Sequence, residues 1–79
     1  MDYQEALKKG VEAKNYERFE EALDWFAQAI ALDNNQPQAY FYRANIYNHS
    51  LKEYGKALED YDKAIELKPN DEGYFYNRA

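Results

Sequence analysis

The chain has 79 residues, of which 46% are hydrophobic and 32% are charged, and it carries a net charge of −5 and no cysteine. A chain of this length forms one small domain, and without cysteine neither a disulfide framework nor a thiolate zinc site can stabilise it. The net negative charge argues against nucleic acids and anionic membranes as partners. The apolar runs are too short to cross a bilayer and no secretory leader is visible, so we expect a cytoplasmic protein.

The residue types favour helices along the whole chain. Threonine is absent and β-branched residues are few, whereas alanine, glutamate, lysine and leucine are frequent. We therefore predict an all-α fold. The expected helices span residues 2–16, 19–32, 37–50, 54–67 and 72–79.

The second expected helix has an amphipathic pattern. Ala22, Phe26, Ala29 and Ile30 fall at i, i+4, i+7 and i+8, which places them on one face of a helix. The third expected helix opens with Pro37, which suits a first helical turn because its missing N–H is not needed there. Residues 34–36 before it are expected to form a loop that supplies capping side chains.

The fourth expected helix repeats the pattern of the second. The same four positions are Ala57, Tyr61, Ala64 and Ile65. Pro69 then interrupts the helix, because proline disfavours helical backbone at the residue before it. Asn70 or Asp71 can cap the helix that follows.

The chain repeats itself at an offset of about 35 residues, since residues 22–32 align with residues 57–67. A fixed period of this length is typical of stacked supersecondary units. We predict a single domain. It comprises residues 1–79, with repeat one at 3–36, repeat two at 37–71 and a partial repeat three at 72–79. Repeat two has one extra residue before its second helix, and we expect it to lengthen the turn around residues 49–52.

Small and bulky side chains recur at fixed positions in the two repeats. They are Gly10, Ala22, Phe26 and Ala29 in the first, and Tyr40, Ala44, Tyr47, Ala57, Tyr61, Ala64 and Pro69 in the second. In these residues the chain resembles the tetratricopeptide repeat (TPR) family. The resemblance implies a right-handed α-solenoid of antiparallel helix pairs with about two and a quarter repeats. Ala6 and Ala13 occupy positions where the family has large residues, so we expect the first helix to pack less tightly.

The resemblance also implies a protein-interaction scaffold that binds a peptide segment in a concave groove, lined by the first helix of each repeat. The family's groove positions map onto Leu7, Val11, Asn15, Gln38, Phe41, Tyr42, Asn45, Asn48, His49 and Tyr76, and also onto Gln4, Lys14 and Gly73. This surface is apolar and aromatic with interspersed amides. We therefore expect a protein or peptide ligand with apolar anchors and, as an option, basic flanks.

Phe41 and Tyr42 have an alternative role in the core between repeats. Three adjacent aromatic residues on a helix point in three directions, so residues 40–42 cannot all be buried. Both roles remain open from the sequence.

One specialised function of the family does not match. Some members hold the free carboxylate of an acidic chaperone tail with lysine, arginine and asparagine side chains. The corresponding positions here are Leu7, Val11, Tyr42, Gly73 and Asn77, none of which is cationic. We therefore do not expect a carboxylate-clamp co-chaperone.

Self-association is the alternative function. The last expected helix is short and carries Tyr74, Phe75 and Tyr76, so an apolar face can stay uncovered and recruit a second copy. The result would be a homo-oligomer formed through this uncapped C-terminal helix. The same open end also fits a chain that is a piece of a longer repeat array.

Catalytic chemistry has little support in the sequence. His49 and Ser50 are neighbours, and neighbouring side chains point about 100° apart on a helix, so they cannot form a nucleophile and base pair. Paired carboxylates such as Glu20 and Glu21 match a solvated helix face, and no histidine or cysteine cluster accompanies them. We expect no enzyme activity, no cofactor and no metal site.

Overall fold

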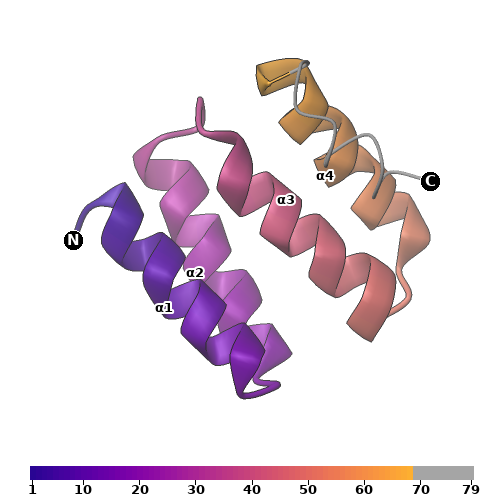
Figure 1. The fold of residues 1–79 in the computed structure, drawn as a ribbon, viewed down its shortest axis with the longest axis horizontal. Coiled ribbons are helices and arrows are strands. Elements are labelled where there is room, and N and C mark those ends of the chain that lie inside the picture. The colour runs from indigo at the N-terminus through magenta and orange to yellow at the C-terminus, as the bar shows by residue number, and fades with distance from the viewer. Residues whose placement is uncertain (69–79) are drawn as a thin grey trace.

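The computed structural model describes residues 1–68. The elements are α1 (Tyr3–Asn15), α2 (Phe19–Leu32), α3 (Pro37–Asn45), the π-helix η1 (Ile46–Ser50) and α4 (Tyr54–Leu67). They form two antiparallel hairpins side by side, α1 with α2 and α3–η1 with α4 (Figure 1). The predicted all-α helical repeat fold is confirmed. The helix expected at residues 72–79, with Tyr74, Phe75 and Tyr76, lies outside the described residues.

The N-termini of α1 and α3, the first helices of the two repeats, are capped in different ways. In α1 the Asp2 carboxylate accepts a hydrogen bond from the Glu5 N–H at 2.9 Å, which satisfies one of the free donors of the first turn. In α3 no side chain of the preceding loop caps the helix. The Tyr3 hydroxyl oxygen instead accepts from the Ala39 N–H at 3.1 Å in a buried position. The first residue of α1 thus caps the first helix of the next repeat.

The hydroxyl of Tyr3 gives a test of this contact between repeats. Burial raises the pKa of Tyr3 above its usual value. In Tyr3→Phe the ring remains but the Ala39 N–H loses its acceptor, so we expect the free energy of unfolding to fall by about 1 kcal/mol. Urea unfolding followed by circular dichroism measures the change. Tyr16→Phe is the control, because Tyr16 is 77% exposed, and a loss of equal size in that variant would contradict the proposed cap.

Helices α1 and α2 approach each other closely at Gly10. A Cβ built on Gly10 would lie 2.5 to 2.9 Å from three ring carbons of Phe26, well inside van der Waals contact. Phe26 has no exposed surface, and Ala22 and Ala29 on the same face of α2 are equally buried. Glycine at this position therefore makes room for the largest fully buried side chain of the first hairpin.

The two hairpins share a hydrophobic core. The Phe26 ring stacks on Tyr42 of α3, with ring centroids 5.6 Å apart and planes 14° from parallel. Ile46 is 1% exposed and belongs to the same cluster as Ala6 and Ala13 of α1. Repeat two consequently completes the core of repeat one, as expected of stacked units that cannot bury their faces alone.

The extra residue of repeat two lies inside a helix and not in the turn, which corrects the prediction. The connections at residues 16–18 and 51–53 have the same length. The middle residue of each, Glu17 and Lys52, has a positive φ, of 61° and 55°. The two turns are thus alike in length and in backbone conformation.

The additional residue is accommodated by the π-helical winding of η1. A π-turn pairs each N–H with the carbonyl five residues earlier, so it holds one residue more than an α-turn. The Leu51 N–H accordingly donates to the Ile46 carbonyl oxygen at 3.0 Å. The helix expected at residues 37–50 is therefore α-helical only as far as Asn45.

A partly buried ion pair joins α3 to α4. The Arg43 guanidinium donates from Nε and Nη2 to the two carboxylate oxygens of Asp60, at 2.7 and 2.9 Å. Asp60 is only 7% exposed, and its hydrogen bonds raise the pKa of Arg43. The matching positions in repeat one hold Lys9 and Trp25, with the ammonium 5.4 Å from the indole centroid. The same place in the hairpin is thus occupied by an ion pair in one repeat and by a cation–π contact in the other.

Candidate functional site

The first helices of the two repeats, α1 and α3–η1, carry the residues predicted to bind a peptide, and we call their surface the first-helix face. On α1, Leu7 and Val11 are half-buried and pack against the core cluster. Asn15, at the end of the same helix, is exposed. This helix thus offers partly accessible apolar groups followed by an amide.

Residues 38, 41 and 42 of α3 are all half-buried. The Gln38 Oε1 atom is buried and finds no hydrogen-bond donor among residues 1–68. Phe41 meets Tyr61 edge to face with centroids 5.9 Å apart, while Tyr42 stacks on Phe26. Both aromatic residues therefore belong in part to the interhelical packing and keep part of their surface accessible.

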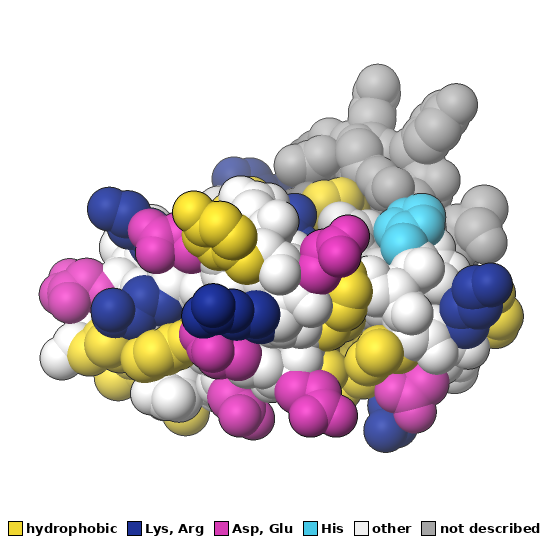
Figure 2. Space-filling model, turned by 90° about the horizontal axis from the view of Figure 1, so that it is seen from below, with side chains coloured by type: hydrophobic (Ala, Val, Ile, Leu, Met, Phe, Trp, Pro, Cys, Tyr) yellow, Lys and Arg dark blue, Asp and Glu magenta, His cyan; other side chains and the backbone are white. Residues whose placement is uncertain are grey.

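A cavity of about 280 Å³ connects α1 to the end of the first helix of repeat two. Its lining residues are Lys14, Asn45, Ile46, His49 and Ser50. It therefore lies between two repeats and includes Asn45 and His49 from the predicted set. Figure 2 shows the molecule from the end where both hairpins turn, and the histidine is exposed there among interspersed acidic and basic side chains.

The amide of Asn45 is oriented from behind the cavity by Tyr61. The Tyr61 hydroxyl donates to Asn45 Oδ1 at 2.5 Å. Tyr61 is 1% exposed, and burial raises the pKa of its hydroxyl, so the phenol stays protonated as a donor well above neutral pH. Because Oδ1 is engaged, the Nδ2 group is the free end of the amide.

Two further contacts position the cavity walls. The Lys14 ammonium lies 5.4 Å from the ring centroid of Tyr42, which ties α1 to α3. Asn48 is half-buried, and its Nδ2 lies 3.5 Å from Nε2 of His49, which is exposed. Of the predicted groove residues, Gly73 and Tyr76 lie outside the described part of the chain.

Ile46 and Ser50 line the cavity but were not among the predicted residues. Ile46 and Ser50 line the cavity because the π-helical turn of η1 contains one additional residue. The repeat offset of 35 residues does not show where in repeat two this additional residue lies. A mid-helix change of winding has no signal in the hydrophobic pattern.

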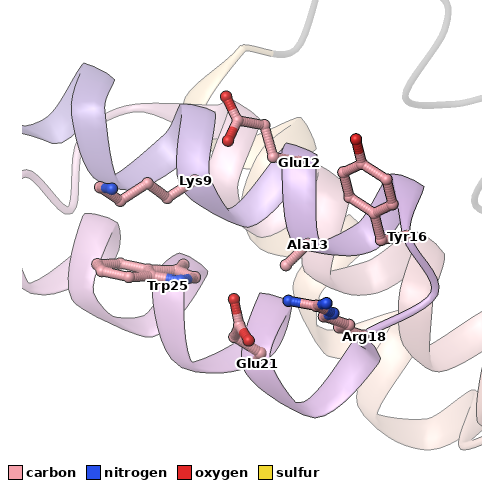
Figure 3. A pocket seen from close by; sticks show the side chains of 7 residues that line it. All are labelled: Lys9, Glu12, Ala13, Tyr16, Arg18, Glu21 and Trp25. Atoms are coloured by element: carbon pink, nitrogen blue, oxygen red, sulfur yellow. The ribbon is translucent and has the colours of Figure 1, made fainter.

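A second cavity, of about 200 Å³, lies between α1 and α2 (Figure 3). Its lining residues are Lys9, Glu12, Ala13, Tyr16, Arg18, Glu21 and Trp25. It adjoins Ala13, one of the two positions where a large residue was expected, whereas Ala6, the other, is completely buried. Ala13 is itself only 4% exposed and belongs to the core cluster, so the looser packing of the first helix stays a prediction. Both charge signs line this cavity, and none of the predicted binding residues does.

Two general properties of residues 1–68 bear on the site. Within this range no cluster of histidine and carboxylate side chains has the arrangement of a metal site. No described helix combines the length and the apolar character that a membrane crossing needs.

Comparison with known protein families agrees with the repeat geometry. A family model described as TPR repeat matches residues 17–49 and 48–79, which together make up more than half of the chain. No curated protein matches the chain. Repeats of this family generally mediate protein–protein interactions, and the family typically forms non-enzymatic scaffolds. The chain belongs to the tetratricopeptide repeat family.

Proposed function

We propose that the chain binds a peptide segment of a partner protein along the first-helix face. The observation that supports this most is the cavity between Lys14 of repeat one and residues 45–50 of repeat two. A ligand seated there would contact both repeats at once. Its binding would therefore depend on how the repeats are stacked, which is how a solenoid forms a binding surface.

The composition of the first-helix face suits a peptide. Leu7, Val11 and Tyr42 are half-buried apolar groups that offer anchor positions without leaving the core. Gln38 and Asn45 supply an acceptor and a donor that can hydrogen-bond a peptide backbone. This division between apolar groups that supply affinity and amides that fix orientation is common at protein interfaces.

The proposal has three further parts. The domain comprises residues 1–79, with residues 72–79 as the start of a third repeat, and it acts in the cytoplasm without a cofactor. The ligand has apolar anchor side chains. The carboxylate-clamp function is not proposed, because Leu7, Val11 and Tyr42 stand where that function needs polar or cationic groups.

Substitution of Val11 tests this proposal. Peptides selected from a displayed random library on the purified chain serve as the probe. In Val11→Gln we expect the affinity for these peptides to fall more than about fivefold, because a polar side chain replaces an apolar contact. Ala27→Gln is the matched control, since Ala27 is an exposed residue of α2 outside the first-helix face. Equal affinity of the two variants, with both folded, would contradict the proposal.

Self-association is the second candidate, and one comparison between repeats favours it. Leu23 of α2 packs against the core cluster, whereas the matching Leu58 of α4 is 44% exposed and Tyr54 is 60% exposed. The described residues thus leave an apolar part of α4 uncovered, which a second copy could cover. Light scattering over a concentration series distinguishes the cases. A dimer weakened by Leu58→Gln would support this candidate, and a monomer throughout would exclude it.

A further inference from the structure

The cavity at the end of the first-helix face presents hydrogen-bond donors and lacks acidic side chains. Lys14 is the one charged residue among its five lining residues, and it is cationic. His49 and Ser50 add an imidazole and a hydroxyl, both of which can donate. The remaining side chains are the amide of Asn45 and the apolar Ile46. A group that accepts several hydrogen bonds and carries negative charge complements such a lining.

The orientation of Asn45 makes the donor character specific. An asparagine amide can ordinarily turn either its oxygen or its nitrogen toward a ligand. Here the Tyr61 hydroxyl donates to Oδ1, so the acceptor end is occupied by a buried protein group. The Nδ2 donor has no partner among residues 1–68, so in this orientation it is the end of the amide that a ligand can use.

The Lys14 ammonium is available to a ligand. It lies against the Tyr42 ring and forms no ion pair within the described part of the chain. A cation–π contact leaves the outward donors of an ammonium free, because the aromatic face occupies only one side of it. Lys14 can therefore keep its contact with Tyr42 and donate to an anion in the cavity.

We propose that this cavity binds the carboxylate of an acidic side chain of the peptide ligand. The inference rests on the proposed function, and it adds an aspartate or glutamate to the apolar anchors expected of that ligand. It differs from the carboxylate clamp, whose positions include Leu7, Val11 and Tyr42 in this chain. The sequence analysis expected basic residues beside the apolar anchors of the ligand. At the part of the ligand that reaches η1, the inference expects an acidic residue in their place.

The net charge of −5 opposes an anionic ligand, but surface charges far from the cavity repel it only weakly. Exposed charges separated by more than a screening length of about 10 Å at 0.1 M salt interact little. A hydrogen bond in which one partner is charged is roughly twice as strong as one between neutral groups. Direct donation from Lys14 and Asn45 therefore outweighs the repulsion from the rest of the surface.

Two lysine variants separate this local effect from the net charge. Lys14→Met and Lys8→Met change the net charge equally, and both lysines belong to α1, but only Lys14 lines the cavity. With the library-selected peptides as the probe, we expect about a tenfold loss of affinity in Lys14→Met, equivalent to about 1.4 kcal/mol. The loss in Lys8→Met should stay below about twofold, because that side chain is exposed and does not line the cavity.

Asn45→Asp is a second test that retains the hydrogen bond from Tyr61. A carboxylate still accepts from Tyr61, but the free end of the side chain changes from a donor to a charged acceptor. Peptides selected on the original chain should bind this variant at least about tenfold more weakly. Replacing the acidic residue of the peptide by its amide should weaken binding to the original chain and have little effect on binding to Asn45→Asp.

The outcomes distinguish the inference from the function on which it rests. Selected peptides that need Val11 but contain no required acidic residue, and that bind Lys14→Met normally, would overturn the acidic-side-chain inference and leave the proposed function standing. Peptides that bind Val11→Gln as well as the original chain would overturn both. Amidation of the peptide C-terminus should have no effect. Loss of binding on amidation would assign the carboxylate to the chain terminus and contradict the proposed side-chain source.

Discussion

Replacement of Asp60 by asparagine should lower the free energy of unfolding by about 3 kcal/mol, because it leaves the Arg43 guanidinium largely buried without its counter-charge. The Asp60 carboxylate accepts two hydrogen bonds from Arg43 at 2.7 and 2.9 Å, and its side chain is 10% exposed against 24% for that of Arg43. This ion pair and the hydrogen bond from Tyr61 to Asn45 are polar contacts between α3 and α4. Urea unfolding monitored by circular dichroism measures the loss.

Two companion variants show whether the loss comes from the unpaired charge. Glu59→Gln removes a neighbouring exposed carboxylate of the same helix and should change stability by less than about 0.5 kcal/mol. Replacing both partners together, Arg43→Met with Asp60→Leu, should restore most of the stability, since apolar groups of similar size need no partner. A double variant less stable than Asp60→Asn would show that the geometry of the pair, and not charge burial, matters most.

Addition of one methyl group at Gly10 should destabilise the chain by about 2–3 kcal/mol, because Gly10→Ala places a Cβ within 2.5 to 2.9 Å of the Phe26 ring. Phe26 has no exposed surface into which to move and is stacked on Tyr42, so α1 and α2 must separate. The helix propensity of alanine favours the variant by only about 1 kcal/mol.

The control for Gly10 is a second glycine in a helix. Gly55 lies in the first turn of α4, and a Cβ added there meets no heavy atom within 4 Å. Gly55→Ala should therefore stabilise the chain by up to about 1 kcal/mol. Opposite signs for the two variants in urea unfolding support the close approach at Gly10. Stabilisation by Gly10→Ala would show that the helices have room for a larger residue.

Much of the fold could be predicted because the apolar residues recur with helical spacing. The helices expected at residues 19–32 and 54–67 occur with those bounds, since Ala22, Phe26 and their counterparts in repeat two mark one buried face. The small side chains at Gly10 and Ala44 indicated close helix crossings, and both residues are buried. Local pattern and tertiary packing agree in these elements.

The rest depends on interactions that no local pattern shows. Counting residues revealed the insertion in repeat two but could not tell a longer turn from a π-helical turn, because both add one residue. Tyr3 caps α3 from 36 positions earlier in the chain, so the loop at residues 34–36 contains no sign of it. Glu17 and Lys52 adopt a positive φ that sequence reasoning expects of glycine.

For the candidate site, the sequence predicted the helix on which each residue lies but not the orientation of its side chain. Asn45 and His49 were expected on the first-helix face and line the cavity there. The donor character of the cavity was not foreseen, because it depends on Tyr61 turning the Asn45 amide from a neighbouring helix. Side-chain orientation of this kind follows from tertiary contacts and not from position along a helix.

The most direct test of the account is to locate a bound peptide by NMR. Backbone amide shifts of the chain are followed while a library-selected peptide is added. Binding along the first-helix face predicts that the largest changes fall on α1, α3 and η1, with Lys14, Asn45 and His49 among the most affected residues. Changes that concentrate on α2 and α4 and leave those helices unaffected would contradict it.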